Sequence, residues 1–184
     1  LMGPNGNGKS TLLSAIMGNP KYQVTEGSIY LDGQNVLEMS VDERSKAGIF
    51  LGMQYPQEIP GVVTSDFLRA ALNAHQEKPV SLFKFIKELD KNIADLKMDE
   101  NLAHRYLNEG FSGGEKKRNE ILQMKLLKPK FALLDEIDSG LDVDALKIVS
   151  EAINDMKSDS FGCVMVSHYE RLFELVPPSH VHIL

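Results

Sequence analysis

The stretch from Gly3 to Ser10 constrains the fold of this chain most, because it reads Gly-Pro-Asn-Gly-Asn-Gly-Lys-Ser. Glycines at this spacing before Lys-Ser are typical of the phosphate loop of P-loop nucleotide-binding domains. They let backbone N–H groups turn inward around an anion, and the helix predicted over Lys9–Met17, closed by Gly18, points its N-terminus at the same anion. We therefore expect nucleotide phosphates to bind at Gly3, Pro4, Asn5, Gly6, Asn7, Gly8, Lys9, Ser10 and Thr11.

An acidic pair follows a short apolar run in the second half of the chain. Phe131–Leu134 predicts a buried strand that leads directly into Asp135 and Glu136. Because ligands of open α/β sheets bind at the carboxyl ends of the strands, we expect these side chains beside the phosphate loop. There Ser10 and Asp135 would hold Mg²⁺, Asp135 through water, while Glu136 would polarise or deprotonate the water that attacks ATP. The predicted cofactors are therefore ATP and Mg²⁺.

The stretch Phe111-Ser-Gly-Gly-Glu115 stands before a helix that continues over Asn119–Leu127. Ser112 and Glu115 fit a capping box, a role confined to the helix itself. A capping box does not need the two glycines between them, since glycine in a first turn lowers helix stability. The glycines instead favour a backbone that approaches a ligand closely, and a helix N-terminus binds anions. Both roles are compatible with these residues.

With these motifs in this order, the chain resembles the ABC ATPases over its whole length. The resemblance implies an α/β P-loop fold, with a mostly parallel sheet core and an inserted helical subdomain. It also implies an ATP-dependent homodimer, in which the Ser-Gly-Gly signature closes over the γ-phosphate held by a second subunit. The signature residues that would reach the nucleotide of the second subunit are Ser112, Gly113, Gly114 and Glu115. The stretch Ser139-Gly-Leu-Asp142 is similar to the D-loop at the dimer interface, and Asp142 would reach the same nucleotide.

Two further residues take roles from the same resemblance. Gln54 is similar to the Q-loop glutamine, which senses the γ-phosphate and ligates the metal. His168 is similar to the switch histidine, which contacts the γ-phosphate. The catalytic set implied for this chain is therefore Glu136, His168 and Gln54, and the metal-binding set is Ser10, Gln54 and Asp135.

Residues around the motifs are most similar to one branch of the family, the ATPases of the Suf iron–sulfur cluster assembly system. After the signature, transporter ATPases typically continue with an apolar Val-Ala-Ile-Ala, whereas this chain has Asn119 and Glu120. The acidic strand end reads Asp-Glu-Ile-Asp-Ser-Gly-Leu-Asp, in place of the transporters' Asp-Glu-Pro-Thr-Ser-Ala-Leu-Asp. The resemblance implies a cytoplasmic ATPase that remodels SufB- and SufD-type scaffold proteins and docks them at the loop Tyr55–Val63. The alternative is a nucleotide-binding subunit of an ABC transporter.

Charge, hydrophobicity and cysteine content argue against three further kinds of function. The formal net charge of −6 over 184 residues argues against broad nucleic-acid binding, which needs a basic face. No apolar run approaches the ~20 residues that span a bilayer, so we do not expect direct membrane insertion. Cys163 is the only cysteine, so the chain has no internal disulfide and no thiolate set for an iron–sulfur cluster. A cluster would have to be built on a partner.

The hydrophobic pattern predicts one domain over 1–184, in which a helical subdomain splits an α/β core. The core comprises 1–56 and 128–184, and the subdomain with the signature comprises 57–127. Predicted core elements are the strands Ser28–Leu31, Ile49–Met53, Phe131–Leu134, Gly162–Val166 and Val181–Leu184, a turn at Asp32-Gly33 and the helix Val143–Met156. Predicted subdomain helices are Ser65–His75, Leu82–Lys97 and Glu100–Leu107, with no strand between Gly61 and Lys128.

Only Leu1 and Met2 precede the phosphate loop, which normally follows a full strand. We therefore expect a fragment that lacks both ends. The aromatic residue that many ABC proteins stack on adenine would lie upstream of Leu1.

Overall fold

A parallel sheet of three strands forms the centre of the computed structural model, which describes residues 1–184. In the order in which they pair, the strands are β3 (Ile49–Gly52), β6 (Phe131–Asp135) and β7 (Gly162–Val166). The register sets Leu51 opposite Leu133 and Asp135 opposite Val166. Because all three strands run in the same direction, the residues that follow them meet at one edge of the sheet.

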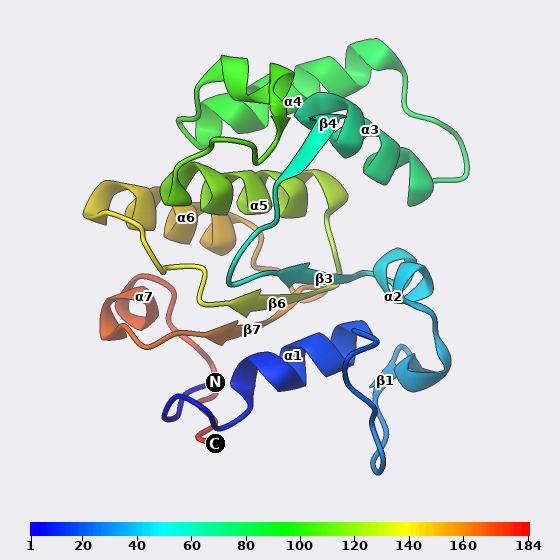
Figure 1. Ribbon diagram of the computed structural model, residues 1–184, viewed down its shortest axis with the longest axis vertical. Helices are drawn as coiled ribbons and strands as arrows, with labels where there is room; N and C mark the ends of the chain where they lie inside the picture. The colour runs from blue at the N-terminus through cyan, green and yellow to red at the C-terminus, as the bar shows by residue number, and fades with distance from the viewer.

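Helices cover both faces of this sheet. Ala132, Leu133 and Leu134 of the middle strand have 0% of their surface exposed, as expected for a parallel sheet buried on both sides. Figure 1 shows the covering helices, with α1 (Lys9–Met17) below the sheet and α5 (Gly113–Leu127) and α6 (Val143–Asp155) above it. The predicted α/β class with a parallel sheet is confirmed.

The hydrophobic interior is divided by the sheet into two clusters. The smaller cluster, which includes Leu13, Ile49 and Val166, lies between α1 and the sheet. The larger one includes Leu134 and Ile121 and continues upward into the helices that follow β4. The upper helices are therefore joined to the sheet through α5 and α6 rather than through a separate core.

Three helical segments and a small sheet build the upper part of the molecule (Figure 1). They are α3 (Thr64–Ala74), α4 (Leu82–Asp95), the 3-10 helix η2 (Glu100–His104), and the antiparallel pair of β4 (Ile59–Val63) and β5 (Tyr106–Leu107). The prediction of no strand between Gly61 and Lys128 is wrong. β4 contains Pro60 and Gly61, is largely exposed and so lacks the alternation that marks a strand, and β5 is too short to show any. The expected helix Glu100–Leu107 is the 3-10 helix η2, which ends at His104, because Tyr106 and Leu107 pair with β4 instead.

The first third of the chain carries a hairpin and two short helices. β1 (Tyr30–Leu31) and β2 (Gln34–Asn35) pair across Asp32 and Gly33, both with positive φ, so the predicted turn is confirmed with a shorter strand than expected. The two short helices after this hairpin are η1 (Val36–Glu38) and α2 (Val41–Ala47). One further short helix, α7 (Glu170–Leu175), lies near the other end of the chain.

The two ends of the chain lie side by side below the sheet (Figure 1). Met2 and Ile183 form an isolated parallel bridge, and the Leu1 ammonium donates a hydrogen bond to the Met165 carbonyl at 2.7 Å. The predicted strand Val181–Leu184 is thus reduced to this one bridge.

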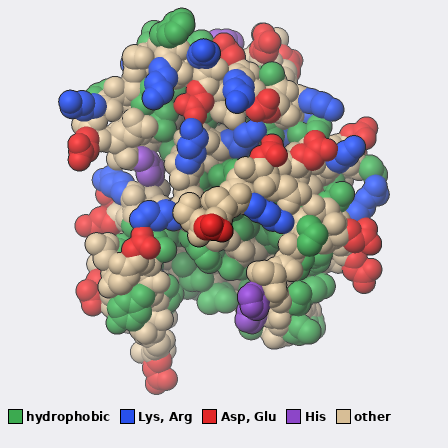
Figure 2. Space-filling model, turned by 180° about the vertical axis from the view of Figure 1, so that it is seen from behind, with side chains coloured by type: hydrophobic (Ala, Val, Ile, Leu, Met, Phe, Trp, Pro, Cys, Tyr) green, Lys and Arg blue, Asp and Glu red, His purple; other side chains and the backbone are tan.

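The surface shows mixed charge and one apolar region. From behind (Figure 2), Lys and Arg side chains alternate with Asp and Glu over the upper half, and hydrophobic side chains gather lower down. A hollow of about 860 Å³ between α1, β7 and the last residues is lined mainly by hydrophobic side chains such as Leu12, Phe161 and Val176. None of the helices combines the length and the apolar character needed to cross a bilayer.

Candidate nucleotide-binding site

The phosphate loop runs from Gly3 to the first turn of α1. Gly3, Gly6 and Gly8 all have positive φ, and Gly8, at 85°, is the residue from which α1 starts. Lys9 is 5% exposed, and its Nζ donates to the carbonyls of Gly3 at 2.7 Å and Pro4 at 2.9 Å. The lysine therefore lies across its own loop and directs its charge into the concave side. The loop residues Pro4, Asn5, Gly6 and Asn7 are exposed, as is Thr11 at the start of the helix.

Ser10 and Asp135 are in direct contact, although they are far apart in sequence. The Ser10 hydroxyl donates to Oδ1 of Asp135 at 3.1 Å. Burial at the end of β6 raises the pKa of Asp135, the bond from Ser10 opposes this, and the neighbouring Glu136 adds to it. A hydroxyl and a carboxylate beside a phosphate loop are the hard oxygen ligands that Mg²⁺ prefers, and a cation here would favour the ionised carboxylate. These two residues fit the predicted metal site.

The Glu136 carboxylate contacts side chains that follow the two neighbouring strands of the sheet. Its Oε2 accepts a hydrogen bond from Nε2 of Gln54 at 2.7 Å, and its Oε1 lies 3.2 Å from Nε2 of His168. Gln54 follows β3, Glu136 follows β6 and His168 follows β7, so the parallel sheet brings together all three residues predicted to be catalytic. Glu136 has a φ of 47°, a left-handed conformation that is uncommon for residues other than glycine.

Gln54 reaches Glu136 rather than the pair that fits Mg²⁺. Its side-chain amide makes its hydrogen bond to Glu136, and no hydrogen bond joins it to Ser10 or Asp135. Its predicted role as a metal ligand stays a prediction.

The Ser-Gly-Gly stretch begins α5, with Ser112 as the N-cap. The Ser112 N–H donates to Oε2 of Glu115 at 2.7 Å, and the Glu115 N–H donates to the Ser112 hydroxyl at 3.3 Å. The predicted capping box is therefore present. These bonds, led by the one from the Ser112 N–H, lower the pKa of Glu115 and keep it ionised at the helix N-terminus.

The two glycines of this stretch are not required by contacts inside the chain. A Cβ added to Gly113 would meet no atom within 4 Å, and one added to Gly114 would meet only Leu141 at 3.8 Å. Neither glycine has a positive φ. The helix that they begin lies on the opposite face of the sheet from α1, which carries the phosphate loop (Figure 1). The first turn of α5 is therefore left open to a ligand or partner outside the chain.

Asp142 caps the start of α6. Its side chain accepts a hydrogen bond from the Ala145 N–H at 2.7 Å, and the residue is exposed. A turn over 137–140 leads toward it from the end of β6. The predicted D-loop aspartate thus caps a helix of its own chain, in addition to any role at a dimer interface.

Three buried charged residues near this site were not predicted. Lys117 and Glu120 face the segment after β3, and Asp138 accepts a hydrogen bond from the Ser167 hydroxyl at 2.6 Å, next to His168. Burial raises the pKa of Asp138, and the bond from Ser167 opposes this. One feature of the sequence could have indicated these buried charges: Glu120 lies where transporter ATPases continue with apolar residues.

The phosphate loop, the strand ends and the parallel sheet together define the chain as a P-loop nucleotide-binding domain. A family model described as "ABC transporter" matches residues 1–139. The chain belongs to this family and forms its ATP-binding cassette.

Several curated proteins are similar to the whole chain. Vegetative protein 296 of Bacillus subtilis (strain 168) is 62% identical over 186 residues, which cover 100% of this chain and 71% of that protein. A probable ABC transporter ATP-binding protein of Streptococcus pyogenes serotype M18 is 59% identical, with 100% and 73% covered. The probable ATP-dependent transporter ycf16 of Pyropia yezoensis is 50% identical, with 100% and 75% covered.

Among solved structures, the chain is similar in fold to the ATP-binding cassette MJ0796 in its dimeric post-hydrolysis state with ADP and Pi. The TM-score is 0.80 at 24% identity, over 95% of this chain and 75% of that one. At this identity the similarity supports the fold alone.

Proposed function

We propose that this chain is the catalytic cassette of a Mg²⁺-dependent ATPase. The observation that carries the proposal is the convergence of Gln54 and His168 on the two carboxylate oxygens of Glu136. A carboxylate oriented from both sides, next to a hydroxyl–carboxylate pair for the metal, has the parts that phosphoryl transfer to water requires. Lys9 and the loop glycines hold the β- and γ-phosphates, and Glu136 activates the attacking water.

We further propose that the active site is shared between two copies of the chain. The signature turn, Ser112 to Glu115, begins a helix on the other face of the sheet from α1, and its glycines face open space. A second copy can therefore place this turn over the γ-phosphate held by the first. Asp142, exposed at the start of α6, would lie at the seam between the copies.

The biological role that we propose is that of a SufC-type ATPase, located in the cytoplasm. The support is in the chain itself, where Asn119, Glu120 and Asp138 follow the Suf pattern, are buried, and each make a side-chain hydrogen bond. In this role ATP-driven dimerisation remodels SufB- and SufD-type scaffold proteins, on which the iron–sulfur cluster is built. The single Cys163 of this chain agrees with a cluster held elsewhere.

The expected loop Tyr55–Val63 is the proposed docking loop for these scaffolds. It is irregular only over 55–58, because Ile59–Val63 forms strand β4. Tyr55 is 72% exposed, and Ile59 and Val62 are also more than one third exposed. Exposed apolar side chains next to Gln54, whose amide donates to Glu136, suit a partner that responds to the nucleotide state. Cross-links to a scaffold that map only outside this loop would remove the assignment.

One experiment separates this role from that of a transporter subunit, which several relatives carry in their names. The protein would be purified with its partners from its own cells, with ATP present, and the bound proteins identified. Recovery of SufB- and SufD-type proteins would support the proposal. Recovery of integral membrane subunits instead would overturn it in favour of transport, while leaving the ATPase assignment intact.

A further inference from the structure

Two oppositely charged side chains are buried side by side on the signature helix α5. Lys117 is 3% exposed and Glu120 is 5% exposed, and their charged atoms lie 3.5 Å apart, one turn from each other. Lysine and glutamate are almost never buried to this extent without a specific partner. Burial lowers the pKa of Lys117 and, despite the lysine, raises that of Glu120 to about 7.

Both side chains bind the backbone of one residue, Met53. The Met53 N–H donates to Oε1 of Glu120 at 2.7 Å, and Nζ of Lys117 donates to the Met53 carbonyl. Met53 is 47% exposed, and both of these bonds are to its backbone. The two residues of α5 therefore hold the N–H and the carbonyl of a single residue, between the end of β3 and Gln54.

We propose that Lys117 and Glu120 are positioning residues that fix Met53 and thereby set where Gln54 presents its amide to Glu136. Gln54 is the next residue after Met53, and it donates to Glu136 at 2.7 Å. Fixing the carbonyl of Met53 fixes the peptide plane that leads into Gln54, since that plane is rigid. The inference rests on the proposed ATPase function, because the carboxylate that Gln54 orients is the one assigned to activate water.

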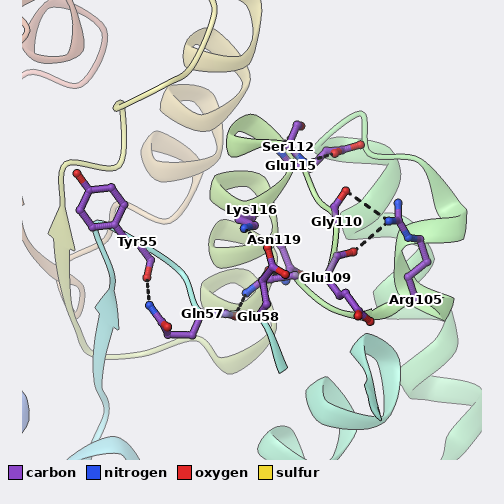
Figure 3. Close-up of polar contacts among 11 residues, drawn as sticks. Tyr55, Gln57, Glu58, Arg105, Glu109, Gly110, Ser112, Glu115, Lys116 and Asn119 are labelled. Carbon is purple, nitrogen blue, oxygen red and sulfur yellow. Dashed lines mark hydrogen bonds and ion pairs between the residues drawn. The ribbon is translucent and has the colours of Figure 1, made fainter. Parts of the chain in front are cut away.

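The loop beyond Gln54 is tied to the same helix. Nδ2 of Asn119 donates to Asn108 at 2.9 Å, and Nδ2 of Asn108 donates to the Gln57 carbonyl at 2.8 Å. Lys116 pairs with Glu58 at 2.7 Å. Figure 3 shows Gln57 and Glu58 of the loop facing Lys116 and Asn119 of α5. Gln54 is thus held between two attachments to α5, so a partner that moves the proposed docking loop relative to α5 also moves Gln54.

Stability alone explains this arrangement poorly. Taking two charges out of water costs so much that replacing a buried ion pair with hydrophobic residues of similar size is often neutral or stabilising. The position after the signature is apolar in the transporter pattern, so an apolar residue is compatible with the helix. A role in holding Met53 accounts for why both charged groups point at its backbone.

The test is the double variant Lys117→Met/Glu120→Leu, which removes both charges together and leaves neither one buried alone. The first measurement is amide hydrogen exchange of Met53 by NMR. We expect the Met53 amide to exchange about tenfold faster than in the wild type, since it loses a hydrogen bond to a charged group. Glu120→Gln, which keeps an oxygen for the Met53 N–H, should retain most of the protection. Lys125→Gln is the matched control, because Lys125 lies on the same helix as Lys117, pairs with Asp95 of α4 and does not contact Met53.

The second measurement is steady-state ATP hydrolysis. The double variant should lose about tenfold in kcat with KM for ATP nearly unchanged, because a misplaced orienting group affects the chemical step and not the phosphate loop. Wild-type protection of Met53 in the folded double variant would overturn the proposal, whatever happens to kcat. So would wild-type kcat with Met53 exchanging freely.

Two safeguards keep the test decisive. If the double variant does not fold, Lys117→Met alone serves, because Glu120 can then take up a proton and remain uncharged. In that variant the proposal still requires lower protection of the segment around Met53 and a lower kcat. If the wild type hydrolyses no ATP, the proposed function fails, while the exchange measurement still decides whether α5 holds Met53.

Discussion

Gln54 and Glu136 lie 82 residues apart in sequence and form a hydrogen bond of 2.7 Å between Nε2 and Oε2. His168 approaches the other oxygen of the same carboxylate at 3.2 Å. The carboxylate is therefore oriented by residues from the two neighbouring strand ends. Each carboxylate oxygen has one such contact and keeps a second lone pair, so Glu136 can accept a hydrogen bond from a water molecule while both contacts remain.

Glu136→Gln should bind ATP with nearly wild-type affinity and hydrolyse it at least about 100-fold more slowly, because the amide cannot accept the proton of the attacking water. Single-turnover hydrolysis with labelled ATP, alongside nucleotide binding, checks both parts. The ATP-bound dimer should also live longer. Glu174→Gln, on the exposed side of α7, is the control for loss of one negative charge. Wild-type turnover in Glu136→Gln would remove this residue from its role.

A mixture of Lys9→Ala and Ser112→Arg chains tests whether the active site is shared. Each variant alone should be nearly inactive, since one lacks the lysine of the phosphate loop and the other blocks the open turn at the start of α5. In a mixed dimer, one composite site retains both wild-type parts. We expect part of the activity to return on mixing, up to about one quarter of the wild type when one site in half of the dimers is intact. No recovery, with mixed dimers demonstrated, argues against sharing.

Asp142→Ala should lower the free energy of unfolding by about 1 kcal/mol, because the N–H of Ala145 loses the side chain that caps α6. Asp142→Asn retains a capping oxygen and should cost much less. Urea unfolding of the monomer, without nucleotide, measures both values. Wild-type stability of Asp142→Ala would show that the cap contributes nothing. Loss of activity in a stable Asp142→Asn variant would report on a role of the carboxylate at the dimer interface.

Glu120 should give the protein a component of stability that decreases as pH rises. Its pKa is raised from 4.5 to about 7 in the folded state, chiefly by burial. The folded state therefore keeps a proton that the unfolded state has released between these two pH values, and this component is lost as pH rises through that window. Its full size is on the order of 3 kcal/mol.

Urea unfolding between pH 5 and pH 8 compares the wild type with Lys117→Met/Glu120→Leu. Burial also raises the pKa of Asp135 and Asp138, in the same direction, but both residues remain in the variant. The difference between the two pH profiles therefore isolates the buried pair. Parallel profiles would mean that Glu120 titrates as an ordinary surface residue.

The sequence predicted the residues at the sheet edge because their positions follow from local rules. The helix Lys9–Met17 has the predicted bounds, since Gly8 and Gly18 on either side take left-handed conformations. Gln54, Glu136 and His168 each follow a predicted apolar strand, so a parallel sheet necessarily gathers them.

The buried pair could not be predicted from periodicity. α5 is packed against the sheet, α3, α4 and α6, and so it has no wide solvent face that would reveal its core by alternation. Lys117 and Glu120 read as surface residues of an ordinary helix in the sequence. Their burial follows from Met53, whose backbone groups face α5 in the folded chain.

The backbone of Glu136 has an evolutionary consequence. A φ of 47° costs a branched or long side chain about 1 kcal/mol, and glycine or asparagine adopts it with little strain. A lineage that no longer needed the carboxylate would gain stability by replacing it with one of these residues. Relatives with glycine or asparagine at this position are then expected to be more stable and inactive, and a retained glutamate marks continued selection for turnover.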